Sequence, residues 1–304
     1  MKNYLNKYFA EGALLLNTLI WGATFVLIKN ALKDISPLLF VAIRFILAGL
    51  ILLPFVKIIF KNADKKTITG GLLLGLLYFL GFSSQTIGLN YTSATKSGFI
   101  TGTFVIFTPI FQFIIEKKVP KFINLLGISI VILGLIFLSS RGDSFFDIFT
   151  EIGTNFNIGD FFTLLCAAFF ALYLVYLDVI SKNHDYMPLV FMQIAVTGLC
   201  GIIFALILSG IGLSSFKFTL TGNILIGILY TSLLATILTT ILQTKYQKVV
   251  TPTKASIIFS FEPIFAALFA FFVLSEKISN FGILGCAIIF IGLLTTELLD
   301  KNKD

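Results

Sequence analysis

Ten apolar segments constrain this chain more than any other feature of its sequence. Each is 17 to 22 residues long, and a helix rising about 1.5 Å per residue needs roughly 20 residues to cross the ~30 Å core of a bilayer. Only 12% of the 304 residues are charged, against about 25% in soluble domains. We therefore predict an all-α polytopic membrane protein with ten transmembrane helices, at Ala10–Ile28, Pro37–Val56, Gly70–Ile87, Ser97–Ile115, Phe122–Leu138, Gly159–Val179, Pro188–Ser209, Asn223–Gln243, Ala255–Leu274 and Phe281–Leu298.

Other features of the composition exclude several classes of protein. The net charge is +7, but the lysines lie in short connections between apolar segments, so we expect no nucleic-acid partner. Cys166, Cys200 and Cys286 fall inside predicted helices without close spacing, which argues against a disulfide framework or a metal site. The single histidine, His184, is expected to be a solvated loop residue. We expect no cofactor, and the lack of a Gly-x4-Gly-Lys-Ser/Thr motif argues against direct ATP coupling.

The distribution of lysine and arginine predicts the orientation in the membrane. With the N-terminus in the cytoplasm, the inside segments hold 15 of these residues, the outside segments hold 6, and Arg44 lies within a helix. Cytoplasmic loops carry the excess of positive charge. We therefore predict ten spans of the cell membrane with both termini cytoplasmic. The first segment lacks a small-residue cleavage site and is expected to be the first helix rather than a signal peptide.

The two halves of the chain repeat each other at an offset of 158 residues. The matching dipeptides are Gln85-Thr86 and Thr95-Lys96 in the first half, and Gln243-Thr244 and Thr253-Lys254 in the second. Gly127 and Gly134 match Gly285 and Gly292 at the same offset. Five helices per half is an odd number, so we predict two inverted repeats, residues 1–142 and 158–304, joined by residues 143–157. Inverted repeats around a central site are typical of transporters.

The match between the halves is incomplete at the prolines. Pro109 and Pro263 are 154 residues apart, one helical turn out of register with the other matches. We therefore expect the two halves to differ at their proline kinks.

A carboxylate in the ninth segment is the first candidate for a functional group. Glu262 lies in the middle third of Ala255–Leu274, directly before Pro263. A charge there costs roughly 2.5–3.5 kcal/mol, so it faces protein or water rather than lipid. Three roles remain open: binding a cationic substrate group or a coupling proton, ion pairing with Arg44, or local hydrogen bonding as a neutral acid.

Polar stripes in three other segments are candidates for a cavity lining or for packing seams between helices. The third segment contains Tyr78 and Gln85. The fourth contains Ser97, Thr101, Thr108 and Gln112, and the eighth contains Ser232, Thr236, Thr239 and Gln243. Trp21 is too deep for an interfacial residue, so it either stacks on an apolar substrate or fills space. Arg44 is interpreted as a structural charge or a substrate ligand.

Several motifs lie along both halves of the chain, at Thr92–Pro109, Thr251–Pro263, Leu274-Ser-Glu276, Trp21-Gly22, Arg44, Leu126-Gly127 and Leu284-Gly285. Together they resemble the signatures of EamA-type permeases of the drug/metabolite transporter superfamily. The resemblance covers essentially the whole chain. It implies two inverted five-helix repeats and a central cavity lined mainly by helices 1, 3, 4, 6, 8 and 9. It also implies export, less often uptake, of small metabolites such as amino acids.

The sequence therefore predicts a permease working by alternating access, with a small-molecule substrate, the lipid bilayer and a coupling proton or counter-substrate as partners. The predicted substrate-binding residues are Trp21, Tyr78, Gln85, Thr101, Thr236, Gln243 and Glu262. The rival hypotheses are a channel and an intramembrane lipid-modifying enzyme. Such an enzyme needs clustered acids with a metal, or a nucleophile–base pair, whereas the acids here are scattered.

Overall fold

The computed structural model describes residues 2–139, 156–212 and 216–300. Eight helical stretches are long and apolar enough to cross a membrane, and two apolar helices, Phe122–Leu138 and Asn280–Thr296, are shorter. Extended backbone pairing in the described part of the chain is one isolated bridge, between Ile35 and Phe218. An all-helical protein with many membrane-spanning helices was predicted and is confirmed. The count of ten spans stays a prediction.

The helices follow the predicted apolar segments closely. In chain order they are α1 (Lys2–Ala31), α2 (Pro37–Leu52), η1 (Leu53–Phe55), α3 (Val56–Ile59), α4 (Lys65–Tyr91), α5 (Ala94–Gly102), α6 (Phe104–Glu116), α7 (Phe122–Ser139), α9 (Ile158–Ser181), α10 (Tyr186–Gly210), α11 (Gly222–Ser232), η2 (Leu233–Leu238), α12 (Thr239–Tyr246), η3 (Gln247–Val249), α13 (Pro252–Phe259), α14 (Glu262–Leu274) and α15 (Asn280–Asp300). Most of the predicted connection between the halves, residues 143–157, lies outside the described residues.

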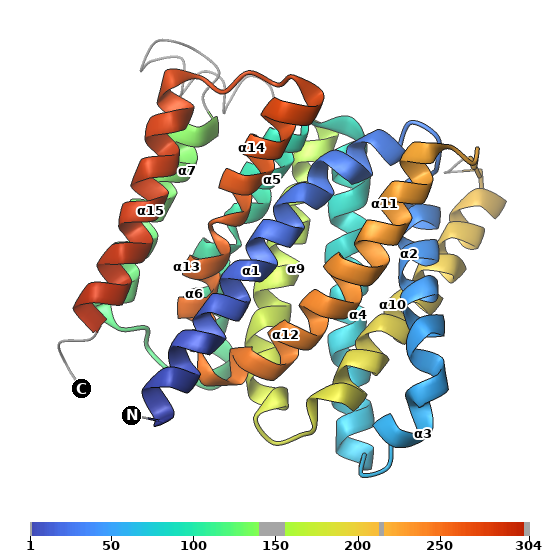
Figure 1. The fold of residues 1–304 in the computed structure, drawn as a ribbon, viewed down its shortest axis with the longest axis horizontal. Helices are drawn as coiled ribbons and strands as arrows, with labels where there is room; N and C mark the ends of the chain where they lie inside the picture. The colour runs from blue at the N-terminus through green and yellow to red at the C-terminus, as the bar shows by residue number, and fades with distance from the viewer. Residues whose placement is uncertain (1, 140–155, 213–215, 301–304) are drawn as a thin grey trace.

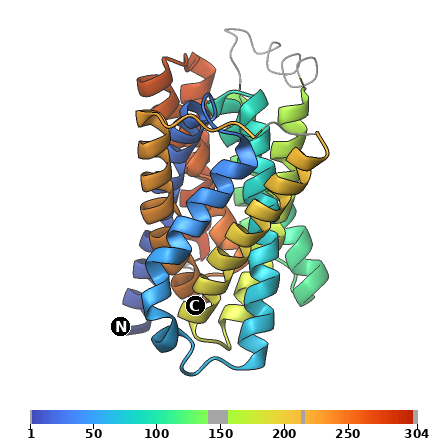
Figure 2. The same ribbon diagram turned by 90° about the vertical axis from the view of Figure 1, so that its right-hand side faces the viewer.

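The helices run side by side from one end of the molecule to the other (Figures 1 and 2). Helices α7 and α15 form one edge, and α2 and α10 lie at the opposite edge (Figure 1). Both termini lie at the same end, together with α3 and the connection from α9 to α10 (Figure 1). The predicted cytoplasmic segments are thus gathered at one end of the molecule.

Neighbouring helices form pairs that match between the two halves. Helix α4 packs on α9, and α1 packs correspondingly on α11 and α12. Helices α5 and α6 also pack on α9, and α13 and α14 pack on α1. The pairs α2–α10 and α7–α15 each join one half to the other. Each half therefore contributes to both sides of the helix bundle.

The matched glycines lie where α7 crosses α15. A Cβ added at Gly285 would lie 2.6 Å from the carbonyl oxygen of Gly134, and one added at Gly127 would lie 3.2 Å from that of Gly292. Small residues let membrane helices approach this closely. The glycines of the sequence repeat thus contact each other across the two halves, which gives them a packing role.

Two of the long apolar stretches are broken into half-helices at matching positions. Helices α5 and α13 begin 158 residues apart, and so do α6 and α14. The breaks themselves match, whereas the expectation that the halves differ at their prolines is confirmed. Pro109 lies inside α6, where it leaves a carbonyl one turn earlier without its helical partner, whereas Pro263 lies in the first turn of α14, where no amide donor is needed.

The ends of these half-helices also match. The hydroxyls of Ser93 and Thr251 accept hydrogen bonds from the backbone N–H groups of Lys96 and Lys254, at 3.2 and 3.3 Å. Such N-caps satisfy donors that a helix start leaves free. At the other ends, Lys117 and Ser275 adopt left-handed conformations, with φ of 56° and 55°.

Candidate functional site

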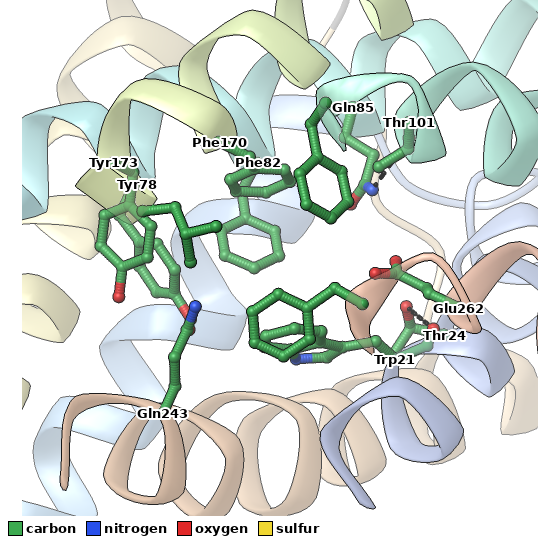
Figure 3. Close-up of a pocket in the computed structure, with 13 residues that line it drawn as sticks. Trp21, Thr24, Tyr78, Phe82, Gln85, Thr101, Phe170, Tyr173, Gln243 and Glu262 are labelled. Atoms are coloured by element: carbon green, nitrogen blue, oxygen red, sulfur yellow. Dashed lines mark hydrogen bonds between the residues drawn. The ribbon is translucent and has the colours of Figure 1, made fainter. Parts of the chain in front are cut away.

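The half-helices α6 and α14 begin at a cavity in the middle of the bundle (Figure 3). Its lining comes from α1, α4, α5, α6, α9, α12, α13 and α14. The lining residues are Trp21, Thr24, Tyr78, Phe82, Gln85, Thr101, Phe104, Phe170, Tyr173, Leu174, Gln243, Phe259 and Glu262. Broken helices that meet at a central site are a common way to build binding sites in membrane transporters.

Glu262 is the first residue of α14, and its carboxylate faces the cavity (Figure 3). Its side chain is 7% exposed. The N-terminal end of a helix favours a negative charge, which offsets part of the cost of burying this carboxylate. In the described part of the chain, no ion pair or hydrogen bond engages its oxygens, so neither pairing with Arg44 nor a local hydrogen bond is seen. The role of Glu262 stays a prediction.

Arg44 does not line the cavity but lies behind it. Its Nε donates to Thr236 Oγ1 at 2.7 Å, and its Nη2 donates to the carbonyl of Ala235 at 2.8 Å. Its guanidinium also lies 4.6 Å from the centre of the Phe82 ring, on which it stacks. The wider turn of the π-helical segment η2 brings Ala235 and Thr236 to this side chain. The interpretation of Arg44 as a structural charge fits these contacts.

Six of the seven predicted substrate-binding residues lie in this one cavity. Thr236 is the exception, because its hydroxyl accepts from buried Arg44. The six are Trp21, Tyr78, Gln85, Thr101, Gln243 and Glu262. All the polar residues of the predicted stripes in the fourth and eighth segments are buried in the protein. Contact of the six residues with a substrate stays a prediction.

Hydrogen bonds hold several of these side chains in place. Trp21 Nε1 donates to Thr239 Oγ1 at 3.1 Å, and Gln85 Nε2 donates to Thr101 Oγ1 at 3.4 Å. The hydroxyl of Tyr78 shares a hydrogen bond of 3.0 Å with Thr240. These bonds orient the aromatic and amide groups before any ligand enters.

The amide of Gln243 is fixed by a chain of hydrogen bonds. Gln247 Nε2 donates to the carbonyl of Leu174 at 2.8 Å, so Gln247 presents its Oε1 as an acceptor. Gln243 Nε2 donates to that oxygen at 3.3 Å. Gln243 Oε1 is buried and has no hydrogen-bond partner. Buried polar atoms are rarely left unsatisfied, so an unpaired one indicates a place for a ligand or water.

Aromatic rings make up most of the rest of the lining. Tyr78 and Phe82 lie with ring centres 4.6 Å apart, and Tyr78 and Tyr173 lie 4.8 Å apart. On the other side, Trp21 and Phe259 lie 5.2 Å apart. The cavity can therefore enclose an apolar body between two groups of rings.

The sequence interpretation did not commit to seven of the lining residues. They are Thr24, Phe82, Phe104, Phe170, Tyr173, Leu174 and Phe259. The repeat in the sequence indicated two of them, Phe104 and Phe259. At the 158-residue offset, Phe259 matches Thr101, and Phe104 matches Glu262. Together with Gln85 and Gln243, three matched pairs line the cavity. The residues of α9 had no comparable signal, since aromatic residues occur throughout this chain.

No group of three or more histidine, cysteine, aspartate or glutamate side chains able to hold a metal ion occurs within the described ranges. Cys166 is buried, and Cys200 and Cys286 are partly buried. His184 accepts or donates a hydrogen bond of 2.9 Å with Thr67. It is therefore more constrained than the predicted solvated loop residue.

Known proteins resemble this chain along most of its length. An Archaeoglobus fulgidus protein named "Uncharacterized transporter" is 31% identical over 294 residues, which is 97% of this chain and 87% of that protein. "Uncharacterized transporter YoaV" of Bacillus subtilis is 24% identical over 94% of this chain and 96% of its own length. "Uncharacterized inner membrane transporter YedA" of Escherichia coli K12 is 29% identical over 43% of this chain and 44% of its own length.

The fold is shared with a solved protein crystal structure, with a TM-score of 0.69 at 12% sequence identity, over 96% of this chain and 98% of that one. The model of the EamA-like transporter family matches residues 9–140 and residues 157–297. Both halves of the chain are thus covered by the same family description. The protein, a multi-pass membrane transporter, belongs to the EamA-like transporter family.

Proposed function

We propose that this transporter moves small metabolites, amino acids or related compounds, out of the cell by alternating access. The observation that carries the proposal is the central cavity, which matched residues of the two halves line together. A site shared by two similar halves can be opened to either side by similar movements of each half. The outward direction rests on the resemblance to EamA-type permeases.

The moving parts are two inverted five-helix repeats, residues 1–142 and 158–304, with residues 143–157 between them. Three observations support this division. The half-helices start in register at an offset of 158 residues, the helix neighbours match between the halves, and the family model matches twice. The ten helices of these repeats then all cross the membrane, including the shorter α7 and α15.

Two ion pairs join the halves at opposite ends of the bundle. Lys96 Nζ lies 2.6 Å from Asp160 Oδ2, and Lys254 Nζ lies 2.7 Å from Glu11 Oε1. Under the proposal, opening towards one side separates one of the pairs while the other holds.

The orientation follows from the positive charges. The segments with the excess of lysine lie at the end where both termini lie (Figure 1), and this end is assigned to the cytoplasm. Lys254 and Glu11 then lie on the cytoplasmic side, and Lys96 and Asp160 on the outer side. Glu262 is the proposed site of a coupling proton, or of contact with a substrate or counter-substrate.

The test of transport is counterflow in proteoliposomes loaded with a mixed pool of amino acids and other small metabolites, read by mass spectrometry. Selective exchange of one chemical class supports the proposal. Exchange that never saturates and is not stimulated by counter-substrate indicates a channel. If no compound moves above protein-free liposomes, with correctly folded protein, transport of these compounds is wrong.

The test of alternating access is cross-linking at each end separately. After replacement of the native cysteines, one variant carries Lys96→Cys with Asp160→Cys, and another carries Lys254→Cys with Glu11→Cys. A cleavable thiol cross-linker should stop counterflow in either variant, and cleavage should restore it. Undiminished counterflow with one end locked contradicts alternating access at that end.

A further inference from the structure

The cavity has one acidic side chain and no basic one. Of its 13 lining residues, Glu262 is the one carboxylic acid, and none is a lysine, arginine or histidine. Arg44 lies behind the lining, where its guanidinium is held by Thr236 and Ala235 and stacks on Phe82. A buried charge without a partner is costly. A cationic ligand would supply the missing partner.

The hydrogen-bonding groups of the cavity indicate the same polarity. Trp21 Nε1–H and one N–H of each of the Gln85 and Gln243 amides donate to protein acceptors. In the described part of the chain, Oε1 of Gln243 has no donor, and the carboxylate of Glu262, which lines the cavity, is a second acceptor open to a ligand. A ligand that carries N–H donors satisfies both, whereas a ligand carboxylate finds no cation in the lining to pair with.

The aromatic rings add a second reason for a cation. Seven of the 13 lining residues are aromatic, namely Trp21, Tyr78, Phe82, Phe104, Phe170, Tyr173 and Phe259. The faces of such rings attract cations, and a ring of them recognises alkylated ammonium groups. Trp21 lies on the Glu262 side of the cavity (Figure 3), so the rings and the carboxylate act on the same group.

The position of Arg44 orients the ligand. Its charge lies behind Phe82, so the region near Phe82 is unfavourable for a second cation. In the described part of the chain, no such cation stacks on Trp21. The ammonium group therefore belongs near Glu262, and the apolar body among Phe82, Phe170 and Tyr173.

We propose that the substrate is an organic amine that is positively charged, carries N–H donors and an apolar body, and has no carboxylate. This inference rests on the proposed function and narrows it. Among compounds related to amino acids, it selects amines, amides and esters that have lost the free acid. Zwitterionic amino acids and organic anions are excluded from this site.

The test compares probes that share one apolar body and differ in charge. They are 2-phenylethylamine, phenylalanine and 3-phenylpropionate, with the trimethylated quaternary form of phenylethylamine as a probe without N–H donors. Trp21 is the single tryptophan of the chain, so its fluorescence in detergent-solubilised protein reports binding without any need for transport. Proteoliposome counterflow with the same probes reports transport.

We expect the amine to bind at least about tenfold more tightly than phenylalanine, and the anion not to bind. The quaternary probe should bind more weakly than the amine. Glu262→Gln should weaken amine binding at least about tenfold, and Glu262→Asp should restore part of it. Gln243→Leu should weaken the amine more than the quaternary probe. Glu116→Gln, beside Lys118 and outside the cavity, is the matched control.

Equal or tighter binding of phenylalanine overturns the inference, and so does amine binding that is unchanged in Glu262→Gln. No amine-dependent change in fluorescence also overturns it, while counterflow of another class from the metabolite pool leaves the proposed function standing. Amine binding without counterflow of any compound supports the inference and contradicts the proposed function. If Glu262→Gln does not fold, the relative affinities of the wild-type protein for the four probes still test the inference.

Discussion

The two broken helices of this transporter share a backbone design and differ in the residue placed at the break. Helices α5/α6 and α13/α14 start, break and end at positions 158 residues apart. At the first residue after the break, one has Phe104 and the other has Glu262, and both line the cavity. The repeated backbone thus builds the site, whereas the difference between the halves supplies its charge.

The ends of the broken helices show a second difference. The ion pair Lys254–Glu11 is buried on both sides, with side chains 6% and 12% exposed, whereas Lys96 is 25% exposed beside buried Asp160. Glu276 adds a contact at the Lys96 end, where its carboxylate accepts from the hydroxyl of Thr95 at 2.5 Å. Glu276 therefore links the end of α14 to the start of α5. Different contacts therefore hold the two halves together at the two ends of the bundle.

The largest expected effect comes from replacing Glu262, so that both broken helices have an apolar residue directly after the break. Glu262→Met replaces the carboxylate with an apolar side chain of similar size. Transport should fall at least about tenfold, because the ligand's counter-charge is lost. The thermal unfolding temperature should stay level or rise, since replacing a buried charge with an apolar group is neutral or stabilising. Counterflow and unfolding in detergent measure the two effects, and a variant that is less stable yet fully active contradicts this account.

The next effect comes from removing one member of each ion pair. Lys254→Met should lower the free energy of unfolding by about 3–5 kcal/mol, because Glu11 is left buried and unpaired. Lys96→Met should cost less, since Lys96 is partly solvated and Asp160 keeps the hydrogen bonds donated by Thr92 Oγ1 and the backbone N–H of Asn157. Denaturant unfolding measures both, and adding Glu11→Gln to Lys254→Met should recover part of the loss. If both lysine variants lose the same free energy of unfolding, burial does not determine how much each ion pair stabilises the protein.

A smaller effect is expected at the crossing of α7 and α15. A Cβ at Gly285 would lie 2.4 Å from the backbone nitrogen of Leu138, so Gly285→Ala should destabilise the protein by about 1–3 kcal/mol. Nothing lies within 4 Å of a Cβ at Gly12, so Gly12→Ala should be neutral or stabilising by less than about 1 kcal/mol. Equal changes in unfolding temperature for Gly285→Ala and Gly12→Ala would contradict the close approach of α7 and α15.

The smallest effects test the caps that the two half-helices share. Ser93→Ala and Thr251→Ala should each cost about 1 kcal/mol, because each removes the acceptor for one free backbone donor. Replacing Ser93 by Thr, and Thr251 by Ser, should cost much less. Unfolding measurements on these four variants compare the caps directly. A cost confined to one half would show that the repeat is structural at one end only.

Much of the fold was predictable because lipid imposes simple rules on sequence. The apolar lengths predicted the helices, and Pro37 predicted the start of α2. The breaks at Thr103 and Phe261 were not predicted, since the apolar segments continue across both and Pro109 lies inside α6 rather than at its start. They depend on contacts with neighbouring helices, such as the packing of Gly102 on Pro263, which no local pattern reveals.

The polar residues of the candidate site were easier to predict from the sequence than the aromatic ones. Glutamine, threonine and glutamate stand out in apolar helices, and most of those selected meet in one cavity. Thr236 lies outside this lining, and a hydroxyl that accepts from Arg44 looks the same in sequence as one that faces a cavity. Phe170 and Tyr173 escaped notice, because an aromatic residue in this chain is as common in lipid-facing positions as in the cavity.

The extended pairing between the α1–α2 and α10–α11 connections limits how the bundle can open. The backbone N–H of Ser36 donates to Lys217 at 3.0 Å, and that of Thr219 donates to Asp34 at 2.9 Å. These connections come from different halves, and paired backbone allows little change in length. Under the proposed alternating access, this corner of the bundle would act as a hinge, and the mouth at this end would open on the far side, where Lys96 and Glu276 lie. A substrate would then pass sideways by the starts of α5 and α9, not straight along the bundle axis.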